Sequence, residues 1–93
     1  MVSRTTDKFW KCFNRLPPRI QDKANGIYPV WKNDPWNPIF QFKQIHKTLP
    51  IYSIRIGIDW RAVGTMKEEQ VIWFWIGSHE DYNKLLKSFL PRG

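Results

Sequence analysis

Residues 51–77 read IYSIRIGIDWRAVGTMKEEQVIWFWIG, and this stretch decides the fold. It holds three runs of strand length, rich in the β-branched and aromatic residues that favour strands, and a shorter run precedes them. The four runs are Phe42 to His46, Ile51 to Ile58, Trp60 to Thr65 and Val71 to Gly77. Only short turns separate them, so the pattern predicts an antiparallel meander.

The run from Ile51 to Ile58 alternates between two kinds of side chain. Tyr52, Ile54, Ile56 and Ile58 share one face, while Ser53 and Arg55 share the other. An antiparallel sheet that is covered on one side only has this alternation. We therefore expect helices on one face of the sheet and an open polar face on the other.

The N-terminal part of the chain predicts a short edge strand, Val2 to Thr5, followed by a helix. Thr5 or Thr6 can cap this helix near Asp7, because a threonine hydroxyl accepts a hydrogen bond from a backbone N–H of the first turn. Its apolar residues recur at helical spacing and are Phe9, Trp10, Phe13 and Leu16. Pro17 then ends the helix.

A second helix can start directly after the first, because proline is tolerated in a first helical turn, and the two form a hairpin. Its apolar stripe is Ile20, Ala24, Ile27 and Trp31. Pro29 lies inside this helix and removes a backbone hydrogen bond, so a kink or a stop is expected near Tyr28. The proline-rich segment Asn33 to Pro38 predicts a turn.

A last helix is expected from about His79 to Phe89, because Ser78 to Asp81 has the spacing of a capping box. The order of elements predicts an α+β fold, with an N-terminal helical hairpin packed on one face of an antiparallel β-meander and a short C-terminal helix. The predicted core includes Phe13, Ile20, Ala24, Ile54, Ile56 and Ile76.

The chain has 93 residues and a net charge of +7, from 15 Lys and Arg against 8 Asp and Glu. This length predicts a single domain, residues 1–93, and excludes a large multi-substrate enzyme. The 16% of aromatic residues are too much apolar mass for a disordered basic tail, so a folded domain displays the charge. A polyanionic partner is expected.

Cysteine usage and hydropathy indicate a soluble, cytoplasmic protein. Cys12 is the single cysteine, so the chain cannot form an internal disulfide or a cysteine-based metal site. The first eight residues lack the apolar stretch of a signal peptide. The longest apolar run, Val71 to Ile76, is far shorter than the ~18 residues of a membrane span, so no membrane partner is expected.

Three cations lie on successive predicted strands: Lys43, Arg55 and Arg61. In a meander they can converge on the open face. Lys43 and Arg55 can equally be ordinary solvated strand positions. Arg61 lies in an otherwise apolar run where a charge needs a partner, so a structural ion pair with Asp59 or Asp81 is the alternative to a functional role.

His79 follows the last strand run and opens the final helix, which places its side chain at the rim of the sheet. Imidazole titrates near neutral pH and is suited to proton transfer. The alternative is a surface histidine in a first helical turn. His46, beside Lys47, is interpreted as a surface group. Trp36, alone in the proline-rich segment, is expected to be exposed, where it could stack on a base or a partner.

Six segments in order are Phe9-Trp10, Leu16-Pro17-Pro18, Phe42-Lys43, Tyr52 to Gly57, Trp60 to Gly64 and Trp73 to Tyr82. Together they resemble the RelE/ParE superfamily of type II toxin–antitoxin toxins over nearly the whole chain. The last segment contains Gly77-Ser78-His79-Glu80-Asp81, which is similar to the Gly-Ser-His-x-Asp arrangement of YafQ-like members.

The resemblance implies a ribosome-dependent mRNA endonuclease, in which strand cations bind the scissile phosphate. Arg55 and Arg61 match those cations, and His79 lies where YafQ-like members carry a catalytic histidine. Attack by the 2′-hydroxyl of the RNA needs an aligned phosphate, cations and an acid, so no metal or cofactor is predicted. The residues predicted to contact RNA phosphates are Lys43, His46, Lys47 and Tyr82.

The resemblance also implies a cognate antitoxin, the ribosome and mRNA as partners, with a toxin–antitoxin hetero-oligomer as a further expectation. Two alternatives stay open. One is a ParE-like inhibitor of DNA gyrase, which needs no acid–base residue. The other is a non-catalytic decayed toxin or binding module whose basic face only docks. His79, flanked by Glu80 and Asp81, favours the nuclease.

Overall fold

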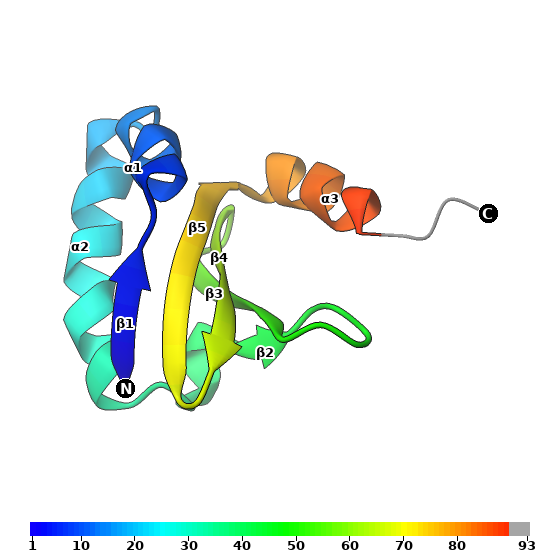
Figure 1. The fold of residues 1–93 in the computed structure, drawn as a ribbon. Helices are drawn as coiled ribbons and strands as arrows, with labels where there is room; N and C mark the ends of the chain where they lie inside the picture. Colours follow the sequence, from blue (N-terminus) through cyan, green and yellow to red (C-terminus); the bar gives the residue numbers. More distant parts are fainter. Residues whose placement is uncertain (90–93) are drawn as a thin grey trace.

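The computed structural model describes residues 1–89 of the chain (Figure 1). Its elements in order are β1 (Val2–Thr5), α1 (Asp7–Asn14), α2 (Pro18–Asn33), the 3₁₀ turn η1 (Pro38–Phe40), β2 (Lys43–Gln44), β3 (Ile51–Gly57), β4 (Trp60–Lys67), β5 (Gln70–Ser78) and α3 (His79–Ser88). The predicted α+β class is confirmed.

The five strands form one mixed sheet in the order β1-β5-β4-β3-β2. The meander from β2 to β5 is antiparallel, as predicted, and β1 is an edge strand that pairs in parallel with β5. The predicted strand Phe42 to His46 is wrong in its extent, because only Lys43 and Gln44 pair. The His46 ring instead accepts backbone N–H bonds within the following loop.

The helical hairpin begins where the sequence predicts. The Thr6 hydroxyl accepts from the backbone N–H of Phe9 at 3.2 Å and caps α1. Of the kink or stop expected near Tyr28, the stop is wrong, because α2 continues through Pro29 to Asn33. Pro29 is exposed, whereas Trp31, two residues later, is fully buried. Packing of this indole holds the last turn of the helix in place despite the missing hydrogen bond.

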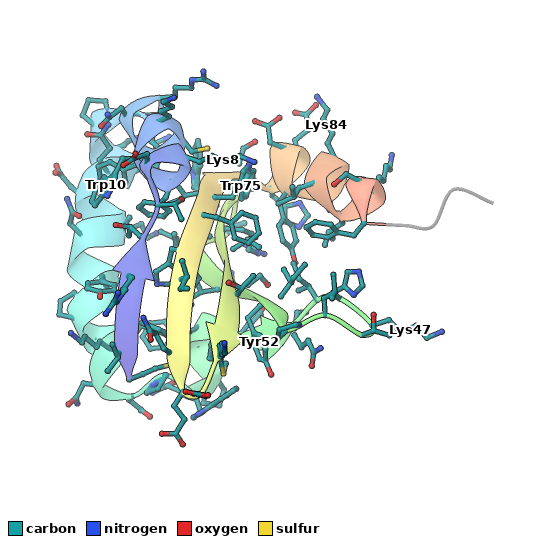
Figure 2. All side chains as sticks on the ribbon, viewed as in Figure 1. Lys8, Trp10, Lys47, Tyr52, Trp75 and Lys84 are labelled. Atoms are coloured by element: carbon teal, nitrogen blue, oxygen red, sulfur yellow. The ribbon has the colours of Figure 1, made fainter. Side chains whose placement is uncertain are left out.

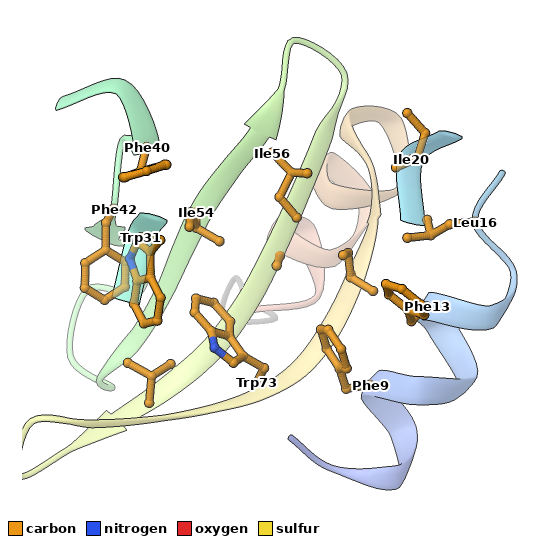
Figure 3. Packing of buried hydrophobic residues seen from close by; sticks show 13 residues of the cluster. Phe9, Phe13, Leu16, Ile20, Trp31, Phe40, Phe42, Ile54, Ile56 and Trp73 are labelled. Atoms are coloured by element: carbon orange, nitrogen blue, oxygen red, sulfur yellow. The ribbon is translucent and has the colours of Figure 1, made fainter. Parts of the chain in front are cut away.

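The main core lies between the helical hairpin and the inner face of the sheet (Figure 3). Its buried members are Phe9, Phe13, Leu16, Ile20, Trp31, Phe40, Phe42, Ile54, Ile56, Ala62, Val71, Trp73 and Ile76. The predicted core residues are all found here, with Ala24 only partly buried at its edge. The Ile58 side chain, expected on the same face, is 75% exposed, because β3 ends at Gly57 and Ile58 lies in the turn.

The outer face of the sheet is not left open, which corrects the one-sided expectation. Helix α3 lies on the opposite side of β5 from α1 and α2 (Figure 1). It buries Tyr82 against Ile51 and Val63, and the Tyr82 hydroxyl donates to Oγ of Ser53 at 3.2 Å. Ser53 is therefore only 2% exposed, although its polarity suggested an exposed position.

No helix among residues 1–89 is long and apolar enough to cross a membrane.

Candidate functional site

Arg55 and Arg61 are directly opposite each other on β3 and β4. Both project from the outer face, since their neighbours Ile54, Ile56 and Ala62 belong to the inner core. Both side chains are half-buried. Two like charges in one cross-strand pair repel unless an anion lies between them. The pair is therefore a potential anion site at the end of the sheet.

The Arg61 guanidinium has partners in the backbone. Its Nη1 donates to the carbonyl oxygens of Gly57 at 2.9 Å, Ile58 at 3.3 Å and Trp60 at 2.8 Å, and so braces the β3–β4 turn. The carbonyl of Gly57 also accepts from Nε of Arg55 at 3.4 Å. These contacts hold both cations beside one turn.

The proposed ion pair of Arg61 with Asp59 or Asp81 is not formed within residues 1–89. Asp81 pairs with Lys84 at 3.9 Å instead. Burial, and then the like charge of Arg55, lower the pKa of Arg61, while Tyr82 and Asp59 partly offset the shift. An anion bound between the two arginines would relieve their mutual repulsion.

His79 is the first residue of α3 and sits beside the same turn. Its backbone N–H donates to the carbonyl of Asp59 at 2.6 Å, and the Ser78 hydroxyl caps the helix by accepting from the N–H of Asp81 at 3.1 Å. The imidazole is exposed, with Nδ1 located 3.3 Å from the Asn83 amide nitrogen. The turn braced by Arg61 thus also positions the backbone that carries His79.

Tyr82 links the helix to the sheet. Its ring centroid lies 5.9 Å from that of His79 and 6.4 Å from that of Trp75. Its hydroxyl is occupied by Ser53. Strand pairing and the helix cap therefore place the backbones of Arg55, Arg61 and His79 at one end of the sheet, and Tyr82 packs beside His79.

The other predicted RNA contacts lie farther along the outer face or in the β2–β3 loop. Lys43 is exposed and pairs in register with Ser53, so it shares the outer face one step away from Arg55. Nδ1 of His46 accepts from the backbone N–H groups of Thr48 and Leu49, and its ring packs near Phe89. Lys47 projects from the tip of the β2–β3 loop (Figure 2).

Residues 18–84, well over half of the chain, match the family model described as a ParE-like toxin domain. The chain belongs to the ParE-like toxin family. This match confirms the resemblance to the RelE/ParE superfamily. No curated protein sequence matches the toxin significantly.

Solved structures of the same fold include toxins from bacteria and archaea. RelE in the RelB–RelE antitoxin–toxin complex from Methanococcus jannaschii has a TM-score of 0.71 at 17% identity, covering 88% of this chain and 96% of that chain. YafQ from E. coli has a TM-score of 0.69 at 10% identity, covering 86% and 94%. The YoeB/ParE toxin from Agrobacterium tumefaciens has a TM-score of 0.62 at 18% identity, covering 85% and 99%.

Sequence reasoning missed that Trp75 lies on the outer face, near this toxin's candidate site. A bulge in the β4–β5 pairing places Phe74 and Trp75 on the outer face together, and Figure 2 shows Trp75 on the α3 side of β5. Its ring covers Gly77, which lies opposite Arg61, and a Cβ there would approach the indole to 2.7 Å. A run of aromatic residues does not show where a bulge lies. The only signal in the sequence for the position of Trp75 was the high density of aromatic residues from Trp73 to Trp75.

Trp36 is exposed, as predicted, but it is not isolated. Its side chain is 59% exposed and its ring centroid lies 4.7 Å from that of Phe42. Among residues 1–89, no three His, Cys, Asp or Glu side chains are grouped closely enough to hold a metal ion.

Proposed function

We propose that this toxin is the toxic component of a type II toxin–antitoxin module and cleaves mRNA on the ribosome. The observation that carries the proposal is the cross-strand pair Arg55 and Arg61 beside the turn that also receives the backbone N–H of His79, whose side chain is exposed. Cations next to a titratable group are what cleavage by an internal 2′-hydroxyl requires.

Each residue has a separate role in this proposal. The arginines hold the scissile phosphate and stabilise the charge that develops on its oxygens. Nη1 of Arg61 is committed to the turn, but Nε and Nη2 have no protein partner within residues 1–89 and are available for the phosphate. His79 protonates the leaving 5′-oxygen. Tyr82 packs beside His79 and orients it.

The partners follow from charge and from the structural relatives. A net charge of +7 favours approach to ribosomal RNA, and such binding weakens steeply with salt. Several proteins of the same fold were solved in complex with an antitoxin, including RelE with RelB and YafQ with DinJ. We propose that a cognate antitoxin forms a hetero-oligomer with this toxin.

Inhibition of DNA gyrase is the second candidate, because the family model that matches is the ParE-like one. Such inhibition needs no acid–base residue, so His79 would be dispensable. A third candidate is a module that docks through its basic face without catalysis.

Induced expression followed by mapping of mRNA 5′ ends separates the three candidates. The wild-type toxin should produce cuts within translated codons, and His79→Ala should remove them at an equal protein level. Supercoiling defects without mRNA cuts would identify gyrase as the target. The absence of both effects would leave only docking.

A further inference from the structure

A further cation, Lys23 of α2, lies against the turn between β3 and β4. Gly57, the last residue of β3, has a φ of +141°, and a Cβ at this position would lie 2.9 Å from Nζ of Lys23 and 3.2 Å from its Cε. The end of the lysine side chain therefore covers the backbone of Gly57. The carbonyl of the same glycine accepts from Arg55 and Arg61. One helix and two strands thus bring three cations to one residue.

The position of Lys23 follows from the buried face of α2. Lys23 comes three residues after Ile20, which is buried, and four before Ile27, which packs against the main core. Residues three and four apart are neighbours on a helix surface, so Lys23 borders the buried stripe. A lysine in such a position lays its methylene stem on the protein and keeps its ammonium group in water. The side chain is exposed, and its charge is therefore available to a ligand.

No acidic side chain neutralises this charge within residues 1–89. The ion pair formed there joins Lys84 to Asp81, and Asp59, in the same turn as the three cations, does not pair with Lys23. The atoms of Gly57 connect the three groups, so covalent geometry places Nζ of Lys23 within about 10 Å of Nε of Arg55 and Nη1 of Arg61. Cations gathered in this way attract a ligand that carries several negative charges.

The two sides of the turn determine how such a ligand lies. Arg55 and Arg61 project from the outer face, whereas α2 packs on the inner face. A nucleic-acid strand carries one phosphate per nucleotide and suits cations that flank a turn better than a single anion does. We infer that Lys23 binds the RNA phosphate next to the one held by Arg55 and Arg61, so that the strand crosses the β3–β4 turn. This inference rests on the proposed RNA substrate.

Binding of a short single-stranded 2′-O-methyl RNA tests the contact, because this RNA has no free 2′-hydroxyl and cannot be cleaved. Lys23→Met keeps the stem and removes the charge. It should weaken binding about two- to fivefold, the size of one exposed ion pair. It should also reduce the slope of log Kd against log salt concentration by about 0.7, the value for one phosphate of a single strand. Lys23→Arg should restore both values.

Lys32→Met is the matched control for the loss of one charge. Lys32 is exposed and lies in the last turn of the same helix, so this variant should bind the RNA with the wild-type slope. In mRNA cleavage, Lys23→Met should raise KM and leave kcat nearly unchanged, because the phosphate that it binds does not react. Thermal melts establish that each variant is folded.

The inference is overturned if the wild-type toxin does not bind the RNA, if Lys23→Met and Lys32→Met bind alike, or if Lys23→Met lowers kcat. A lower melting temperature of Lys23→Met with an unchanged salt slope would also overturn it, because the lysine would then only cover Gly57. The binding assay does not depend on cleavage. RNA binding through Lys23 without cuts in mRNA would therefore support the contact and reject the nuclease.

Discussion

The two faces of the sheet are built on opposite principles. The inner face is a continuous apolar core beneath α1 and α2, whereas the outer face combines an arginine pair, an exposed histidine and a small apolar cluster beneath α3. Burial of apolar surface on the inner face supplies most of the stability. Within residues 1–89, the two arginines of the outer face lie opposite each other and form no ion pair, which is a cost that folding alone would not select. Stability and proposed chemistry are thus divided across one sheet.

The largest expected effect is a loss of mRNA cleavage when His79, on the outer face, is replaced. His79→Ala should lower single-turnover mRNA cleavage by about 10²–10⁴-fold, the usual contribution of a general acid. The free energy of unfolding should not change, because the imidazole is exposed. His79→Gln should not restore cleavage, since an amide cannot deliver a proton. Ser88→Ala, at an exposed position at the other end of the same helix, is the control and should cleave mRNA as the wild type does. Unchanged cleavage by His79→Ala would end the acid role.

Substitutions on the inner face should change the free energy of unfolding. Trp31→Ala removes a fully buried indole and should lower the free energy of unfolding by about 3–5 kcal/mol in urea denaturation. Trp36→Ala is the matched control and should cost about 1 kcal/mol, because that indole is mostly exposed. Equal losses for the two variants would show that burial of apolar surface beneath the hairpin is not what stabilises the inner face.

Substitution of Arg61 should affect both growth inhibition and the stability of the fold. Arg61→Ala should abolish growth inhibition and also lower the free energy of unfolding by about 1–2 kcal/mol, because three turn carbonyls lose their donor. Arg55→Ala should reduce growth inhibition with a smaller loss of stability. Lys43→Ala should change neither by much. If Arg61→Ala is unfolded at the assay temperature, its role is structural only.

The smallest expected effect concerns the contact that holds α3 on the sheet. Tyr82→Phe should cost about 1 kcal/mol in thermal unfolding, because buried Ser53 loses its donor. The double variant Tyr82→Phe with Ser53→Ala should recover part of this loss, since both polar groups are then absent. Purely additive losses would show that the hydrogen bond contributes nothing.

The inner face was largely predictable from the sequence, because the spacing of apolar residues assigns Phe13, Ile20 and Ile54 to one side of their helices or strand. The outer face was predictable only in its residue types. Ser53 is covered by Tyr82, 29 residues away, and no local pattern reports which surface a terminal helix covers. The hydrogen bonds from Arg61 to the turn carbonyls could not be predicted either, because backbone acceptors have no sequence signature.

Two local features of the backbone were also not predictable from the residue types. Glu68 and Glu69 both adopt positive φ, at 51° and 63°, and form a tight turn without the glycine or asparagine that usually marks one. Trp31 kept α2 helical beyond Pro29, because tertiary packing outweighed the local preference. Both cases depend on contacts between segments, which the spacing of residues along one segment does not record.

The parallel pairing of β1 with β5 has a consequence for the order of folding. Thr6 and Trp73, which continue that pairing, are 67 residues apart, so a chain made at about 5–20 residues per second spends roughly 3–13 s between synthesising the two. The helical hairpin and the first meander strands involve shorter separations and can form earlier. The sheet is completed last, by the strand that was synthesised first.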